Sequence, residues 1–237
     1  MTRAGVLGAV LAGAALALVS LAAAASSGPA PTGVEIARLV VASPVRARPT
    51  SQSTLLGRIA AIRPLTHQQT ALPVVRRVAD GRGAEWLQVR LPGRPAGRVG
   101  WMSAANAVVS RSPWRVVVNR STRQASVYRG DRLYRRYPVV VGTPWTPTPA
   151  GHYFVVEHVS QTPGSMLGPW ALATSAFSHV LQEFDGGPGQ IALHGRAGAL
   201  AADPLGTARS HGCIRFDNDV IQRLSGLLVN GTPIDIV

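Results

Sequence analysis

The sequence contains a single cysteine, Cys213, in 237 residues. With one cysteine no disulfide can form within the chain, so stabilisation by a disulfide framework is excluded. The thiol is therefore free, joined to another chain, or reactive. The residues around it, SHGCIRF at 210–216, must decide between these roles.

Long apolar runs are absent except at the N-terminus. Arg3 precedes an uncharged stretch rich in Ala, Leu and Val over 4–25, which ends in small residues. This pattern is typical of a signal peptide, but the run is also long enough for a membrane anchor. We therefore predict a signal peptide or N-terminal anchor over 1–25, with cleavage favoured, and a linker over 26–33. The protein is expected to be exported, acting in the periplasm or cell-wall space, secreted or tethered to the membrane.

Lysine is also absent, and all 24 basic residues are arginine. Residues 1–136 contain 20 arginines and four acidic residues, a net charge of +16, whereas residues 137–237 have a net charge of −3 from four arginines and seven acidic residues. Such a front half favours contact with anionic wall polymers or a membrane surface, although a merely solvated surface is the alternative. Export argues against nucleic acid as a partner, so none is expected.

Few helix-length periodic runs occur in the first folded part. Short apolar segments separated by turn dipeptides such as DG and PG predict a small β-barrel over 34–110. The stretch EWLQVRLPGRPAGRVGWM, which contains Trp86 and Trp101, resembles bacterial SH3-like domains. Both tryptophans are expected in the core rather than as platforms for a ligand.

The second predicted domain, 113–237, is again mainly β, with one short C-terminal helix over 218–228 capped by Asp217. Arg129-Gly130-Asp131 predicts a hairpin turn, and the prolines of TPWTPTPAG exclude a helix or central strand at 143–151. Residues 159–189 are expected to form a long loop, either a lid or a substrate groove. Trp170 and Phe177 would line it, unless they belong to the core.

The SHGC sequence supplies parts for thiol chemistry. A histidine can take the proton of Cys213 to leave an ion pair, and Gly212 lets a carbonyl approach backbone amides that stabilise an oxyanion. His194 and His211 both precede the cysteine, which excludes the order of papain-like proteases, and the caspase signature is absent. On these residues alone, a buried structural thiol beside a hydrogen-bonded histidine stays equally possible.

The motifs HGR at 194–196 and SHGCIR at 210–215 resemble the signature of L,D-transpeptidase (YkuD-type) catalytic domains. The stretch TPTPAGHYFVV and the run ending in GGPGQIALHG are also similar to that family. The resemblance implies that Cys213 is the nucleophile and His194 the general base, with the Gly195 carbonyl orienting the His194 ring. It also implies an oxyanion pocket lined by the amides of His211, Gly212 and Cys213.

Two further positions belong to this motif. Ser210 is expected to shape the turn, and Arg215 stands where many members have asparagine and could pair with a substrate carboxylate. The implied reaction is acyl transfer between peptidoglycan stem peptides through a Cys213 thioester, with release of D-Ala. Water as acceptor would give an L,D-carboxypeptidase. The resemblance implies no cofactor and no metal, and acylation by carbapenems.

Two other functions are compatible with parts of the sequence. A zinc peptidase could use His194, His211, Cys213 and Asp203 as ligands, but no H-E-x-x-H motif supports it. A catalytically inert wall-binding protein is the third alternative. The remaining histidines are not expected to be catalytic: His152 should pack on a strand, His67 should lie at the surface, and His158 and His179 fall near or within the long loop.

Overall fold

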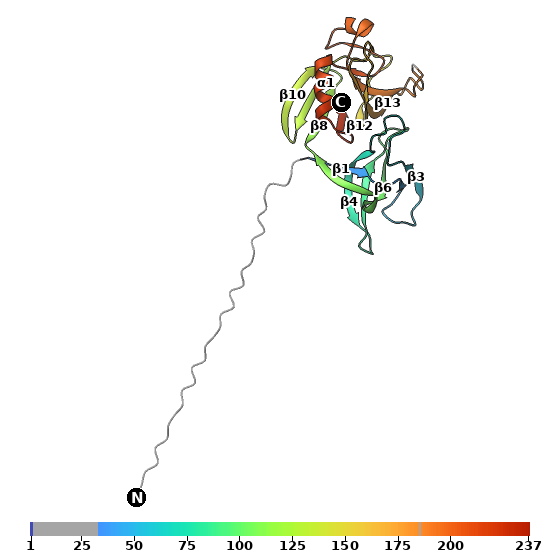
Figure 1. Cartoon of the computed structure of the whole chain (residues 1–237), viewed down its shortest axis with the longest axis vertical. Coiled ribbons are helices and arrows are strands. Elements are labelled where there is room, and N and C mark those ends of the chain that lie inside the picture. The colour runs from blue at the N-terminus through green and yellow to red at the C-terminus, as the bar shows by residue number, and fades with distance from the viewer. Residues whose placement is uncertain (2–32, 185) are drawn as a thin grey trace. The chain divides into compact units, whose positions relative to one another are not determined.

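The computed structural model describes residues 1, 33–184 and 186–237. The predicted export segment and linker therefore lie outside the described residues, apart from Met1 and Gly33. Within the described part, no helix is long and apolar enough to span a membrane. Residues 33–237 belong to one compact unit, and the fold is mainly β with one short C-terminal helix, as predicted (Figure 1).

The first sheet contains seven antiparallel strands in the order β3-β2-β6-β5-β4-β1-β7. Its strands are β1 (Val34–Leu39), β2 (Ser43–Arg46), β3 (Leu55–Ile59), β4 (Ala71–Ala79), β5 (Glu85–Arg90), β6 (Val99–Ser103) and β7 (Ala107–Ser112), and a 3₁₀ turn, η1 (Ala104–Asn106), precedes β7. Trp86 and Trp101 are both buried, which confirms that they are core residues. The SH3-like character of this part stays a prediction.

The second sheet has eight strands in the order β10-β9-β8-β17-β12-β13-β14-β16. They are β8 (Trp114–Asn119), β9 (Gln124–Arg129), β10 (Arg132–Pro138), β12 (Gly151–Ser160), β13 (Trp170–Phe177), β14 (Gln190–His194), β16 (Ile214–Arg215) and β17 (Pro233–Ile236). A separate pair joins β11 (Val141–Gly142) to β15 (Ala208–Ser210), and η2 (Gly198–Ala202) is a second 3₁₀ turn. Helix α1 (Asn218–Leu227) packs against β13 and β14.

Strand β12 joins the hydrophobic cores of the two sheets. Successive side chains of a strand point to opposite faces. Tyr153 and Val155 accordingly lie in the core of the second sheet, whereas Phe154 and Val156 lie in the core of the first. A strand buried on both faces reads as a continuous apolar run, and YFVV is such a run.

Polar contacts reinforce this junction at the end of β12. The carboxylate of Glu157, which is 5% exposed, accepts hydrogen bonds from Arg63 (3.2 Å) and the Thr66 hydroxyl (2.8 Å). The side-chain amide of Gln68 bonds to both the backbone C=O and the backbone N–H of His158, as a neighbouring strand would. The connection between β3 and β4 is thus fixed to β12 through partly buried hydrogen bonds.

Local predictions for the second domain have mixed outcomes. The turn at Gly130-Asp131 joins β9 to β10, as expected. Of the segment 143–151, residues 143–150 form neither helix nor strand, but Gly151 begins the central strand β12. The long loop predicted over 159–189 is wrong, because its middle is β13, a central strand flanked by β12 and β14. Asp217 does occupy the N-cap position of α1, but its side chain makes no capping bond and instead pairs with Arg196 at 2.8 Å.

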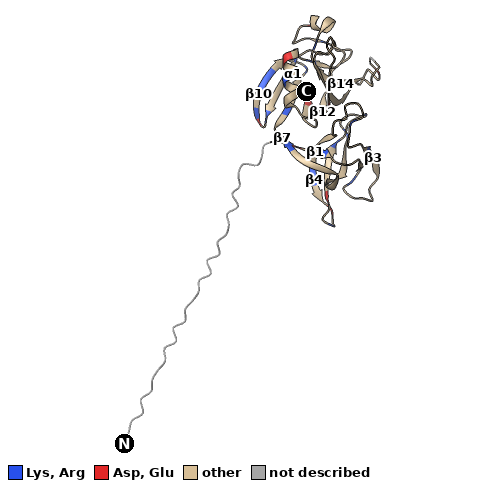
Figure 2. Cartoon of the chain, viewed as in Figure 1, with Lys and Arg blue, Asp and Glu red and all other residues tan. Residues whose placement is uncertain are grey.

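The other histidines differ in exposure and in their partners. His152 is on β12, as expected, but its ring points to solvent and lies 2.6 Å from the Asp235 carboxylate rather than packing. His67 and His179 are exposed, while His158 is half-buried near Trp170. The edge strand β10 carries three arginines, Arg132, Arg135 and Arg136, and is marked blue in Figure 2.

Candidate active site

The two motif blocks lie side by side because β14 and β16 pair in parallel. Leu193 lies opposite Ile214, and His194 lies opposite Arg215. Cys213 precedes Ile214 and Ala192 precedes Leu193, so the same register brings Cys213 close to Ala192. The backbone N–H of Ala192 points at the Cys213 sulfur, 3.4 Å away.

His194 ends β14 and is 3% exposed. Its Nδ1 lies 2.6 Å from the backbone oxygen of Gly195, and its own carbonyl accepts the N–H of Phe216 at 2.8 Å. A carbonyl oxygen can only accept, so Nδ1 must carry the proton of the neutral ring. The lone pair is then on Nε2, which is the atom able to take a proton.

The backbone after His194 is held by a residue that sequence reasoning missed. The side-chain oxygen of Asn218, the first residue of α1, accepts the N–H of Arg196 at 2.9 Å. A Cβ on Gly195 would clash with that oxygen and would lie 3.1 Å from both the Gly168 Cα and the Leu167 carbonyl oxygen. A larger residue at 195 would therefore displace Asn218, which holds the segment whose carbonyl orients the imidazole. The position of Asn218, five residues after Cys213, gave no sequence signal.

The turn before Cys213 is built by short polar contacts. The Ser210 hydroxyl donates to the Cys213 carbonyl (2.6 Å) and accepts the N–H of Gly212 (3.1 Å), and the Thr148 hydroxyl donates to the Gly212 carbonyl (2.8 Å). Gly212 has φ +121°, and a Cβ there would lie 2.8 Å from the Ile191 side chain. Thr148 was not singled out in the sequence, where only the prolines around it were informative.

The amides near the sulfur differ in their availability. The N–H of Gly212 is already occupied by Ser210, which does not fit its expected role in an oxyanion pocket. Among the described residues, the backbone N–H groups of His211 and Cys213 donate to no protein acceptor. The ring of His211 lies at the surface, 5.0 Å from the ring of Phe184 between centroids.

Arg215 does not fit its expected pairing with a substrate carboxylate. It is 5% exposed, and its guanidinium donates to the carboxylate of Asp203 at 2.6 Å. The charge is therefore neutralised inside the protein. Arg215 is buried because it lies on β16 between two backbone neighbours. Its backbone pairs with His194 of β14 on one side and with Val140 on the other.

The electrostatics favour a neutral thiol and a neutral imidazole. Burial lowers the pKa of His194 from 6.5 to about 4; the hydrogen bond to Gly195 opposes this shift and the nearby Arg215 charge adds to it. Burial also raises the pKa of Cys213, although the residue keeps partial exposure, while the Ala192 N–H and Arg215 oppose that rise. Both shifts have the same physical cause, because the charged forms of Cys213 and His194 lose solvation on burial.

The residues of the zinc alternative do not assemble into a ligand set. In the part of the chain that the structure describes, no group of three or more His, Cys, Asp or Glu side chains could hold a metal ion. Asp203, one of the four residues considered, is instead paired with Arg215.

Comparison with known proteins agrees with the motif. The family model described as the L,D-transpeptidase catalytic domain (YkuD) matches residues 113–236. A protein of Bacillus licheniformis named as an L,D-transpeptidase YkuD is 28% identical over 156 residues, which cover 63% of this chain and 85% of that protein. Its namesake in Bacillus subtilis is 25% identical over 124 residues, covering 52% and 66%.

Solved structures are also similar. Bdellovibrio bacteriovorus Bd1075 is 31% identical with a TM-score of 0.42, over 53% of this chain and 48% of the other, so this chain spans about half of its length. An L,D-transpeptidase from Mycobacterium smegmatis is 17% identical with a TM-score of 0.43, over 87% of this chain and 100% of the other. Since the family model covers more than half of the 237 residues, this chain belongs to the L,D-transpeptidase catalytic-domain family.

Proposed function

We propose that this protein is a peptidoglycan L,D-transpeptidase that joins stem peptides through a thioester on Cys213. The observation that carries the proposal is the fixed tautomer of His194. The Nδ1–H of His194 is bonded to the Gly195 carbonyl, so the free lone pair of the ring is on Nε2. His194 lies on the same strand as Ala192, whose backbone N–H contacts the sulfur of Cys213. A neutral imidazole with a fixed tautomer, on the strand that contacts the thiol, is what proton transfer from Cys213 requires.

The first half of the reaction forms the acyl-enzyme. His194 Nε2 takes the Cys213 proton as the sulfur attacks the carbonyl carbon between the L-centre of diaminopimelate and the terminal D-Ala. The C–N bond then breaks, and His194 returns the proton to the leaving amine of D-Ala. Acceptor attack on the thioester reverses these steps: an amine loses a proton to His194, the C–S bond breaks, and the thiol is regenerated.

The developing oxyanion needs donors that are not already used. The N–H groups of His211 and Cys213 meet this condition, so we assign the oxyanion to them rather than to Gly212. One such donor contributes on the order of 3 kcal/mol to transition-state stabilisation. Ser210 and Thr148 support the pocket indirectly, because they hold the backbone that carries these donors.

The neutral resting pair determines when charge forms. With the pKa of Cys213 raised and that of His194 lowered, the thiol keeps its proton until a carbonyl is in place. Proton transfer then accompanies attack, as in a serine triad in which the carbonyl of Gly195 takes the orienting role. Such a thiol is protected from adventitious oxidation in an oxidising compartment, because the thiolate is the reactive form.

The cellular setting belongs to the same proposal. An enzyme acting on stem peptides must be exported, which the sequence of residues 1–25 favours. Anionic wall polymers or the membrane surface would attract the arginine-rich front half of the chain. The acceptor amine, the substrate peptide and the location are all parts of the proposal that direct experiments must establish.

Product analysis in labelled water tests the proposal. A diaminopimelate-containing disaccharide tetrapeptide is incubated with the protein in H₂¹⁸O, and the products are resolved by mass spectrometry. Transpeptidation predicts a crosslinked dimer, free D-Ala and no ¹⁸O in the new amide. A tripeptide carrying ¹⁸O would instead establish an L,D-carboxypeptidase. Absence of D-Ala release from folded protein would contradict both and favour the inert wall-binding alternative.

A further inference from the structure

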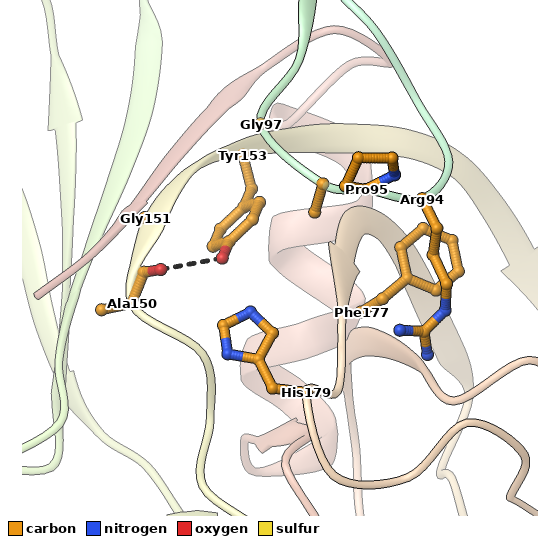
Figure 3. Close-up of a pocket in the computed structure, with 9 residues that line it drawn as sticks. Arg94, Pro95, Gly97, Ala150, Gly151, Tyr153, Phe177 and His179 are labelled. Carbon is orange, nitrogen blue, oxygen red and sulfur yellow. Dashed lines mark hydrogen bonds between the residues drawn. The ribbon is translucent and has the colours of Figure 1, made fainter.

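An arginine of the first sheet reaches into the second. Arg94 lies in the connection between β5 and β6, and its guanidinium donates to three backbone carbonyls after β13: Ser178 (3.0 Å), Leu181 (3.1 Å) and Pro188 (2.9 Å). Its Cζ also lies 4.9 Å from the centroid of the Phe177 ring. Figure 3 shows the guanidinium beside Phe177, with His179 on the other side of the cavity.

The carbonyls converge because the segment they belong to is closed at its base. We call residues 178–184 together with 186–189 the β13–β14 connection. The N–H of Ser178 donates to the Gly189 carbonyl at 2.8 Å, and the Ser178 hydroxyl accepts the N–H groups of Val180 (3.2 Å) and Leu181 (2.9 Å). Gly189 has φ +63°, and a Cβ there would clash with the Leu181 carbonyl. Arg94 thus satisfies carbonyls that the connection cannot satisfy itself.

The same connection touches the candidate active site at two places. At its far end, the Phe184 ring lies 5.0 Å from the ring of His211, tilted by 31°. At its near end, Gly189 leads directly into β14, which carries Ala192 and His194. A shift of the connection would therefore move a neighbour of the oxyanion segment and the start of the strand that holds the base.

Arg94 also lines a cavity at this junction. The space, about 590 Å³, is lined on one side by Arg94–Gly97 of the first sheet and on the other by Tyr153, Phe177 and His179. Ala150 and Gly151 complete it, two and three residues after Thr148, whose hydroxyl bonds to Gly212. Residues of both β5–β6 and β13–β14 connections thus line one cavity, together with the segment that follows Thr148 (Figure 3).

We propose that Arg94 is a positioning residue for substrate binding: through it the first sheet holds the β13–β14 connection, and with it Phe184, against His211. Arg94 touches no reacting atom, so it acts through the connection. Charged donors make strong hydrogen bonds to carbonyls, and three bonds from one planar group fix orientation as well as distance. The kinetic part of this inference rests on the proposed acyl transfer, whereas the structural part does not.

The test compares three variants of the full chain. Arg94→Ala removes all three bonds, and Arg94→Lys keeps the charge without the planar fork. Arg98→Ala is the matched control, because Arg98 lies in the same β5–β6 connection but is exposed and donates only to the Pro95 carbonyl (3.3 Å). Hydrogen exchange of the connection amides and the rate of acylation by a carbapenem against its concentration are measured for each.

Arg94→Ala is expected to speed exchange in the β13–β14 connection by about tenfold or more, since each bond to a charged donor contributes about 1.5 kcal/mol or more. Exchange in β12 and β17 should stay unchanged. The carbapenem concentration for half-maximal rate should rise by about tenfold while the limiting rate stays within about threefold. Arg94→Lys should fall between, and Arg98→Ala should match the unmodified protein.

Other results would overturn the proposal. If Arg94→Ala left both exchange and half-saturation unchanged, or lowered only the limiting rate together with thermal stability, Arg94 would have a structural role alone. If Arg94→Ala failed to fold, Phe184→Ala would decide, because it should reproduce the rise in half-saturating concentration, and an unchanged value would refute the proposal. If the unmodified protein were not acylated, the proposed function would fail. Hydrogen exchange would still test whether Arg94 holds the β13–β14 connection.

Discussion

The backbone N–H of Ala192 donates to the sulfur of Cys213 across 3.4 Å, from a position two residues before His194 on the same strand. Cys213 immediately precedes β16, and His194 ends β14. The thiol and the imidazole are therefore both carried by the ends of one parallel strand pair. The register of β14 with β16, rather than a flexible loop, sets the relation between base and nucleophile.

Acid should inactivate the site at an unusually low pH for histidine. Folded His194 stays neutral until the pH falls to about 4, so the acylation rate should be lost through that pH and not near 6.5. The unfolded chain binds the proton earlier, so the free energy of unfolding should decrease as the pH falls from about 6.5 to about 4, by up to about 3 kcal/mol. His194→Asn should reduce this dependence in denaturant titrations, and the remainder includes His158, whose pKa is also lowered by burial. An acid limb centred near 6.5 would contradict the burial of His194.

Gly212→Ala should impair the site and the fold together. Its φ of +121° disfavours any side chain, by about 1–2 kcal/mol, and the new Cβ would press on Ile191. Acylation should slow strongly because the neighbouring amides shift. Gly226→Ala is the control: it lies in α1 with no atom within 4 Å, so it should stabilise the helix by about 0.5 kcal/mol and leave acylation unchanged. Equal acylation rates in both variants would refute the assigned geometry.

Asp203→Ala should destabilise the protein by about 3 kcal/mol, measured by denaturant unfolding, because it leaves the buried Arg215 guanidinium unpaired. Arg209→Ala is the matched control. Arg209 also faces Asp203, but at 3.8 Å and with an exposed side chain, so its loss should cost less than about 1 kcal/mol. Comparable losses in the two variants would show that Arg215 is not held by Asp203.

Ser210→Ala tests the turn without touching the thiol or the imidazole. It removes the bonds to the Cys213 carbonyl and the Gly212 N–H, and should cost about 1–3 kcal/mol of stability and slow acylation. Ser225→Ala, which loses one exposed bond to the Gln222 carbonyl, should change neither. Wild-type acylation kinetics in Ser210→Ala would exclude a supporting role for this hydroxyl.

Local sequence signals predicted the elements that local physics determines. Gly130-Asp131 marks a hairpin, and the apolar run at 153–156 marks a strand, because turn and strand preferences depend on neighbouring residues. The strand Trp170–Phe177 was missed. Glycine and proline before it, and small residues such as Ala and Ser within it, hid a strand that is stabilised by β12 and β14 rather than by its own propensity.

The site shows the same division. Cys213, His194 and Gly195 are visible because their motifs are short and contiguous. Arg215 was misjudged, because its partner Asp203 is twelve residues away and an arginine looks alike whether it faces substrate or a buried carboxylate. Arg94 gave no signal, since backbone carbonyls, which are its partners, exist at every residue. The neutral state of the thiol and imidazole depends on burial, which only the packed structure reveals.

Intact mass of the protein after incubation with a carbapenem tests the central claim most directly. The proposed mechanism predicts one drug-sized adduct on the unmodified protein, none on Cys213→Ala, and much slower formation on His194→Ala than on His211→Ala. Loss of the adduct in His211→Ala with full retention in His194→Ala would contradict the assignment of the base. A folded, unmodified protein that forms no adduct with either a carbapenem or a tetrapeptide donor would contradict the thioester route itself.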